Sequence, residues 1–131
     1  MVQEWNLKKR IITYGLVGLI ILGAFFWCYE HVEEGMRIDH VKKRIPTLVT
    51  DAMQEYYICT DKKITSLDDL TVEVIGIDGQ KHGPFIYANR DPWGTPFKYD
   101  AEALKIISAG PDKTFGTKDD IEVKIADVTK P

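Results

Sequence analysis

Residues 11–29 of the 131-residue chain read IITYGLVGLIILGAFFWCY, a run of 19 residues without a charged side chain. At about 1.5 Å per residue a helix of this length spans about 28 Å, close to the ~30 Å hydrocarbon core of a bilayer. Ten of these residues are Leu, Ile, Val or Phe, which together favour insertion by about 3–6 kcal/mol. The run therefore predicts a transmembrane helix.

The charges on the two sides of this run differ in sign. Residues 1–10 carry a net charge of +2, with a Lys-Lys-Arg cluster beside the run, whereas residues 30–131 carry a net charge of −5. Cytoplasmic flanks of membrane spans are enriched in Lys and Arg. We therefore expect a cytoplasmic N-terminus at 1–10, a transmembrane helix at 11–29 and the remainder of the chain on the other side of the membrane.

Two other interpretations of the run are open. A core helix of a soluble protein can be equally apolar, and a cleaved secretory signal also places an apolar run near the N-terminus. Core helices seldom have flanks sorted by charge, and a signal has an apolar core of only about 7–15 residues before a small-residue cleavage site. This run is longer and ends in the bulky residues Phe25, Phe26, Trp27 and Tyr29. These features favour a retained single span.

Residues 30–60 are expected to continue this helix outside the membrane. Apolar residues recur there at helical spacing and form one stripe: Ile38, Val41, Ile45, Leu48, Ala52, Tyr56 and Cys59. Pro46 lies within the stripe, where we expect it to kink or break the helix. The alternative to one long helix is two helices joined near Gly35.

Residues 61–131 have the pattern of a small β domain. Alternating apolar and polar residues predict strands at 71–74, 97–99, 104–106 and 121–125, and residues 84–87 are a short strand or an extended segment. A short helical turn is predicted at 66–70, turns at 78–79 and 91–96, a hairpin connection at 100–103 and a polar loop at 110–120. The predicted fold class is α+β, with a long N-terminal helix, partly transmembrane, followed by a small antiparallel sheet.

The segment at residues 108–120 concentrates groups that a hard cation can bind. It contains Asp112, Asp119 and Asp120, together with two glycines. Ca²⁺ takes about six to eight oxygen ligands from carboxylates and carbonyls, and glycines let a loop wrap so that its carbonyls converge. The segment is not an EF-hand, because Val123 stands where that motif has its Glu. Spacing alone leaves both a calcium site and a solvated acidic turn open.

Two motifs in the second half of the chain occur in order and at close spacing. Residues 91–99 read DPWGTPFKY, and residues 104–121 read LKIISAGPDKTFGTKDDI. Together they resemble the major pseudopilin of the type II secretion system, protein G, which has D-P-W-G-x-P-[YF]-x-Y followed by S-x-G-x-D-x-x-x-G-T-x-D-D-I. Residues 51–70 resemble the end of the family's helix more loosely. The resemblance implies a pilin-like fold, in which the outer half of a long helix packs on an antiparallel sheet.

The resemblance also implies that the C-terminal loop binds one structural Ca²⁺. By position, the ligands would be the carboxylates of Asp112, Asp119 and Asp120 and the backbone carbonyls of Ala109 and Thr117. The ion would tie a loop without regular secondary structure to the last strand, and would offset the repulsion among the carboxylates. Millimolar calcium outside the cytoplasm suits a site of modest affinity.

The N-terminal part differs from the family. Members have a short basic leader that ends in Gly and is followed by Phe-Thr-Leu-x-Glu, and a prepilin peptidase cleaves after the Gly and methylates the new N-terminus. In this chain Gly15 is followed by Leu-Val-Gly-Leu-Ile, and no acidic residue lies between Lys8 and Glu30. The contact between the Glu and the N-terminal amine of a neighbouring subunit is therefore missing, which leaves processing and entry into a filament open.

These observations predict a structural component of a type II secretion system, a calcium-stabilised unit of the pseudopilus. We expect it in the bacterial inner membrane with a periplasmic C-terminal domain, in contact with the membrane and with other pseudopilin subunits or copies of itself. The alternative is an uncleaved, membrane-anchored envelope protein whose pseudopilin-like domain does not polymerise. No nucleophile–base pair, phosphate-binding loop or Cys/His cluster indicates an enzyme or a small-molecule substrate. The formal charge of −3 provides no basic field for nucleic acid.

Overall fold

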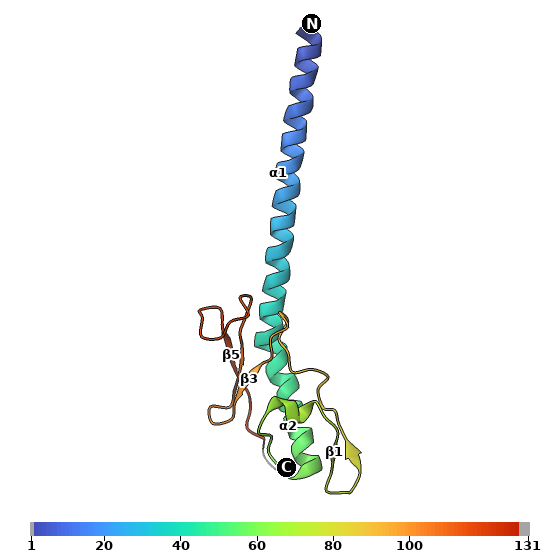
Figure 1. Ribbon diagram of the computed structural model, residues 1–131, viewed down its shortest axis with the longest axis vertical. Helices are drawn as coiled ribbons and strands as arrows, with labels where there is room; N and C mark the ends of the chain where they lie inside the picture. Colours follow the sequence, from blue (N-terminus) through green and yellow to red (C-terminus); the bar gives the residue numbers. More distant parts are fainter. Residues whose placement is uncertain (1, 129–131) are drawn as a thin grey trace. The chain divides into compact units, whose positions relative to one another are not determined.

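The computed structural model describes the backbone of residues 2–128 and the side chains of residues 12–128. The chain divides into two compact units, Met1–Met36 and Arg37–Pro131. Its elements in chain order are α1 (Val2–Asp39), the π-helical turn η1 (His40–Arg44), α2 (Ile45–Thr60), the 3₁₀ turn η2 (Leu67–Leu70), β1 (Val74–Ile75), β2 (Lys81–His82), β3 (Lys98–Asp100), β4 (Lys105–Ser108) and β5 (Ile121–Lys124) (Figure 1).

The described part of the first unit, residues 2–36, lies within helix α1, which ends at Asp39. The helix contains the whole of residues 11–29 and continues through Gly35, so the alternative of two helices joined near Gly35 is wrong. Large apolar side chains along the run are exposed, among them Leu19, Ile20 and Phe25, whereas a core helix of a soluble protein buries such residues. In the part of the chain that the structure describes, one helix is long and apolar enough to cross a membrane, and it contains this run.

The helix widens into the π turn η1 just before Pro46. Proline has no N–H to donate, and in a regular α-helix its ring would clash with the carbonyl four residues earlier, that of Lys42. In η1 the N–H of Ile45 donates to the carbonyl of His40, five residues back, which is the hydrogen bond of a π turn. Pro46 then stands in the first turn of α2, where a missing N–H is tolerated. The proline therefore does not break the helix.

The π turn also moves the buried face of the helix by one residue. Because a π turn contains more residues than an α turn, the stripe that includes Val41 continues at Val49 and Met53. These two side chains are 3% and 2% exposed, whereas that of Leu48 is 51% exposed. Leu48, which the predicted stripe includes, is for this reason not on the buried face. The predicted stripe holds for the buried Val41 and Ala52 and for the partly buried Ile38, Ile45 and Tyr56.

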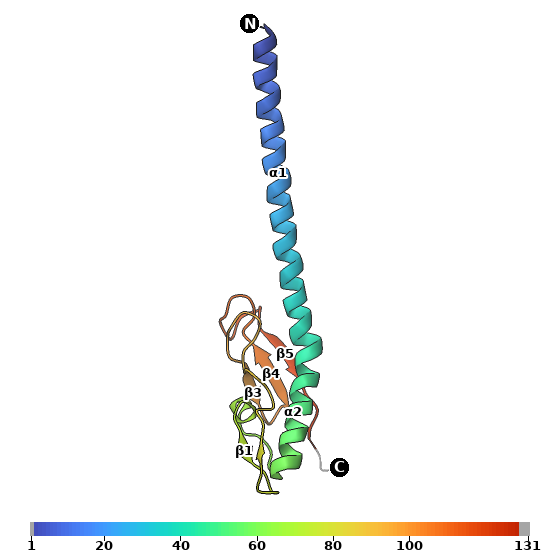
Figure 2. The same cartoon turned by 90° about the vertical axis from the view of Figure 1, so that its right-hand side faces the viewer.

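The main sheet has three antiparallel strands in the order β3-β4-β5, and Figure 2 shows it beside α2. Ile106 of β4 lies opposite Val123 of β5. Every second residue of β5 is buried, as the alternation at 121–125 predicts, so one face of the strand is apolar. The pairing of β3 with β4 confirms the hairpin predicted between residues 97 and 106.

The second sheet is the short hairpin of β1 and β2. Val74 lies opposite His82, and the predicted turn at residues 78–79 connects the two strands. The strand predicted at 71–74 is wrong except for its last residue, because the N–H of Thr71 closes η2 by donating to the carbonyl of Asp68. The strand β2 was not predicted.

Residues 84–87 form no strand. The N–H groups of Phe85 and Ile86 both donate to the carbonyl of Leu70, at 2.8 and 3.0 Å. This bifurcated acceptor ties the segment to the end of η2. The short helical turn predicted at 66–70 is confirmed, since Ser66 accepts from the Asp68 N–H and the Asp69 carboxylate accepts from the Ser66 N–H, which is a capping box.

The core of the second unit brings these elements together. The rings of Tyr56 and Phe85 meet edge to face with centroids 5.6 Å apart. The buried core consists of Val41, Val49, Ala52, Met53, Ile64, Leu67, Leu70, Ile86, Phe97, Ile106, Ile121, Val123, Ile125 and Val128. The predicted α+β, pilin-like arrangement of one long helix with small antiparallel sheets is confirmed.

Alanine substitutions of Met53 and Leu48 test whether the buried face of the helix is shifted. We expect Met53→Ala to lower the free energy of unfolding by about 2–5 kcal/mol, because it leaves a cavity in the core, and Leu48→Ala to change it by less than about 0.5 kcal/mol. The measurement is urea unfolding of the full-length protein in detergent, followed by the fluorescence of Trp93. Trp5 and Trp27 are changed to Phe for this purpose, and the resulting protein is called the single-tryptophan protein. A larger effect of Leu48→Ala than of Met53→Ala would place the buried face where the uninterrupted spacing puts it.

Candidate metal centre

The loop between β4 and β5 closes on itself at Gly110. The residue has a φ of +70°, which glycine adopts without strain. A Cβ at this position would overlap the backbone carbonyl of Asp119. The beginning and the end of the loop thus lie in contact, and this contact requires a glycine.

Side chains of the loop accept hydrogen bonds from backbone N–H groups that a neighbouring strand would otherwise accept. An Asp112 carboxylate oxygen accepts from the Thr114 N–H at 2.9 Å. Asp120 Oδ2 accepts from the Gly116 N–H at 2.8 Å, and the Asp120 N–H donates to the Thr117 carbonyl at 3.3 Å. The polar loop predicted at 110–120 is therefore irregular but held by a set of local hydrogen bonds.

The predicted ligands lie in different environments within the loop. Ala109 is fully buried, Asp119, Asp120 and Thr117 are half-buried, and Asp112 is exposed. Asp120 Oδ1 is a buried oxygen with no hydrogen-bond partner. A buried carboxylate oxygen without a partner is costly, and a cation is the kind of ligand that would satisfy it.

The three acidic side chains do not form one cluster. Among residues 12–128, no group of three or more His, Cys, Asp or Glu side chains lies close enough to hold a metal ion. The convergence of Asp112, Asp119 and Asp120 therefore stays a prediction. What the structure brings together is Gly110 with Asp119, and the residue that follows Asp119 in the chain carries the unpartnered oxygen, Asp120 Oδ1. Carboxylate and carbonyl oxygens of this kind fit a hard cation, which also accepts water as a ligand.

A buried carboxylate outside the loop holds its first residues. Asp91 is 5% exposed and Ser108 is fully buried. One Asp91 oxygen accepts from the N–H groups of Trp93 and Thr95 at 3.1 and 2.8 Å, and the other accepts from the Ser108 hydroxyl at 2.7 Å. Ser108 Oγ in turn accepts from the Gly110 N–H at 3.1 Å.

The sequence predicts the turn at 91–96 but not this chain of contacts. An Asp that opens a turn is the residue type that accepts N–H groups two residues on. The link from Asp91 to Ser108 crosses 17 residues and has no local signature. A further contact joins β3 to the middle of the loop. The Lys98 ammonium lies 3.9 Å from the centroid of the Phe115 ring, within the range of a cation–π interaction.

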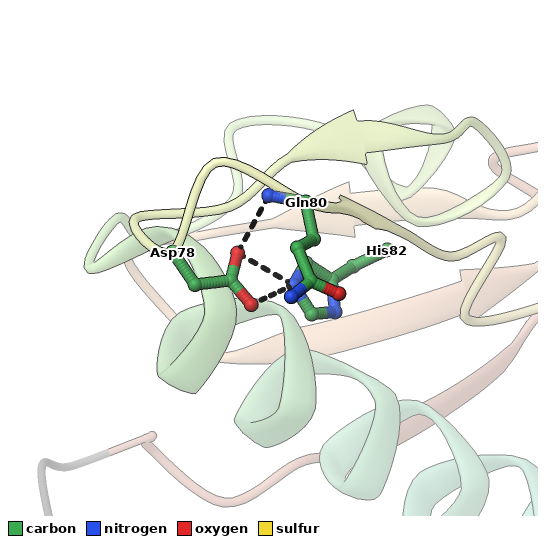
Figure 3. A network of polar contacts seen from close by, with 3 residues as sticks. All are labelled: Asp78, Gln80 and His82. Carbon is green, nitrogen blue, oxygen red and sulfur yellow. Dashed lines mark hydrogen bonds and ion pairs between the residues drawn. The ribbon is translucent and has the colours of Figure 1, made fainter.

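A second polar group lies on the β1–β2 hairpin (Figure 3). His82 Nε2 lies 2.9 Å from both carboxylate oxygens of Asp78, and the Gln80 N–H donates to the same carboxylate at 2.9 Å. The Gln80 hydrogen bond, and then the one with His82, lower the pKa of the Asp78 carboxyl. A Cβ on Gly76 would overlap the His82 ring, so the group closes the hairpin tightly and has a structural role.

The two glycines of the loop allow a matched test of its closure. We expect Gly110→Ala to destabilise the single-tryptophan protein more than Gly116→Ala in urea unfolding. Both residues have positive φ, +70° and +88°, which costs an alanine about 1–2 kcal/mol. Only at Gly110 would the new Cβ also meet backbone, since nothing lies within 4 Å of a Cβ at Gly116. Equal costs would show that the loop is not closed at Gly110 in solution.

Comparisons with known proteins were made for the whole chain. Searches of curated proteins and of solved structures found no match. The family model of the type II secretion system (T2SS), protein G, matches residues 32–126. The matched segment includes α2, all five strands, both motifs and the candidate cation loop. It covers most of the chain, and the chain therefore belongs to the type II secretion system protein G family.

Proposed function

We propose that the protein is a structural subunit of a type II secretion pseudopilus, with an outer domain stabilised by calcium. The observation that carries this proposal is the family match over residues 32–126. Members of this family are structural components of the secretion system and not enzymes. The protein would thus function as an assembly unit. Its helix would anchor the subunit, and its domain would face neighbouring subunits.

The proposed location is the bacterial inner membrane, with the N-terminus in the cytoplasm and residues 30–131 in the periplasm. The exposed apolar residues of α1 support membrane insertion, because lipid is the environment in which such a surface is stable. The positive charge before the run and the negative charge after it support the orientation. Its partners would be other pseudopilin subunits or further copies of this chain.

The proposed calcium ion is structural. Asp112, Asp119 and Asp120 would supply carboxylates, and Ala109 and Thr117 would supply carbonyls. The unpartnered oxygen of Asp120 supports this assignment, as does the approach of Asp119 to Gly110. The ion would neutralise charge in the loop and hold its two ends next to β5, and a site of modest affinity is filled where calcium is millimolar.

A second candidate function is a permanently anchored envelope protein that does not polymerise. The observation in its favour is the span itself, since residues 11–29 contain no carboxylate. An ionisable group inside a membrane is expensive and is normally present for a purpose. In the family that purpose is a contact between subunits, and this chain would have to assemble without it.

Calcium should stabilise the single-tryptophan protein against urea or heat, because a ligand that binds the folded state adds stability by mass action. At a calcium concentration 100 times the Kd the gain is about 2.7 kcal/mol relative to chelator. We expect Asp119→Ala to abolish most of this gain. Glu102→Ala is the control, since it removes an exposed acid of the β3–β4 turn and should leave the gain unchanged. Identical unfolding with calcium and with chelator would rule out the site.

The intact mass of the protein from native membranes distinguishes the two candidate functions. Cleavage of a short leader before the span, with methylation of the new N-terminus, is the expected result for a pseudopilus subunit. Crosslinks to other pseudopilins in the same membranes would accompany it. A full-length mass for all membrane-bound protein would instead support the permanently anchored, non-polymerising form.

A further inference from the structure

The buried pair Asp91 and Ser108 joins the two sequence motifs of the outer domain. Asp91 opens the turn at 91–96, and Ser108 is the last residue of β4, immediately before the loop. Both side chains are at least 95% buried, and the 2.7 Å bond between them is within the range of charge-assisted hydrogen bonds. A buried carboxylate needs such partners, and Asp91 has three, the Ser108 hydroxyl and two backbone N–H groups.

The direction of this hydrogen-bond chain is set by chemistry. A carboxylate only accepts, so the Ser108 hydroxyl must donate its hydrogen to Asp91. The lone pairs of Ser108 Oγ are then available to the Gly110 N–H, which donates to them at 3.1 Å. Without Asp91 the hydroxyl could rotate and turn its own hydrogen toward Gly110. Asp91 therefore determines which way Ser108 presents its acceptor.

The Gly110 N–H shares a peptide plane with the Ala109 carbonyl. The 109–110 peptide bond is trans, since the one cis bond found in the described residues is Gly83–Pro84. In a trans peptide the N–H and the C=O point in opposite directions. Ser108 therefore fixes the direction of the Ala109 carbonyl when it holds the Gly110 N–H. On the far side of the same residue, Gly110 is held by the approach of Asp119, so the peptide has little freedom to turn.

We propose that Asp91 and Ser108 are positioning residues of the calcium loop, which aim the Ala109 carbonyl and couple the 91–96 turn to cation binding. This inference rests on the proposed calcium site. Neither residue is a ligand in it. Partners that orient metal ligands typically change metal affinity by about 10–100-fold when they are removed, and we expect about a tenfold loss for either residue.

The coupling also predicts a signal at a distance. The Trp93 N–H donates to the same carboxylate that holds Ser108, and the Trp93 side chain packs against the core. Calcium binding should therefore change the emission of Trp93, although Trp93 is no ligand. This change should disappear when the hydrogen-bond chain is broken.

The experiment is a titration of the full-length single-tryptophan protein in detergent with CaCl₂, read by Trp93 emission and by the calcium-dependent shift in the unfolding midpoint. Ser108→Ala removes the hydroxyl. Asp91→Asn keeps the size of the side chain but gives it an N–H group, which competes with the Gly110 N–H for Ser108 Oγ. Each variant should raise the calcium Kd about tenfold. The double variant should be no weaker than either single one, because both act through one peptide plane.

The control variant is Ile106→Val, which trims a fully buried residue of β4 outside the hydrogen-bond chain. It should lower the unfolding midpoint with and without calcium by the same amount and leave the Kd unchanged. Should Asp91→Asn fail to fold, Ser108→Ala decides the matter alone. An unchanged Kd in a folded Ser108→Ala protein overturns the positioning role and leaves the calcium site standing. A parent protein that shows no response to calcium overturns the calcium site itself.

Discussion

The second unit of the chain depends on the burial of one face of α2 against short strands. Within residues 2–128 no strand exceeds four residues, and sheets of this size are not stable without a packing partner. That partner consists of Val41 in η1 and of Val49, Ala52 and Met53 in α2, and full burial of a large apolar side chain contributes about 1.5–3 kcal/mol. The π turn before Pro46 decides which residues take part. The π turn that accommodates Pro46 therefore also determines which helix residues belong to the core.

The acidic residues of the loop have two tasks that depend on each other. A segment without a strand partner must still satisfy its N–H groups, and Asp112 and Asp120 each accept one of them. A carboxylate has two oxygens, so an Asp that holds the backbone with one can offer the other to a cation. Asp120 is in this position, since Oδ2 is bound by Gly116 and Oδ1 has no partner. In the proposed calcium site, the loop would thus supply cation ligands from the same side chains that hold its backbone.

Local signals in the sequence predicted most of the fold. Alternation identified β5, turn residues identified the loops, and the uncharged run identified α1. The errors arose where one backbone feature changed the pattern of the residues that follow it. Leu48 is exposed because the π turn η1 precedes it, and residues 71–73 form no strand because the Thr71 N–H closes η2. For the candidate site, the motif predicted the ligands, but the Asp91–Ser108 link could not be predicted because no spacing rule connects residues that meet only in the folded chain.

The two units of the chain are stabilised by different environments, and this bears on how a subunit could assemble. A carboxylate at the centre of a membrane helix costs on the order of 2.5–3.5 kcal/mol, so a span without one is stable in lipid as a single helix. It has no charged group to drive association. Packing between copies would then rest on van der Waals contact, and Gly15, Gly18 and Gly23 lack the G-x-x-x-G spacing that allows two helices to approach most closely. A filament of this subunit would be held mainly through the domain outside the bilayer, and the rigidity of its cation loop would matter more than in a subunit with a charged span.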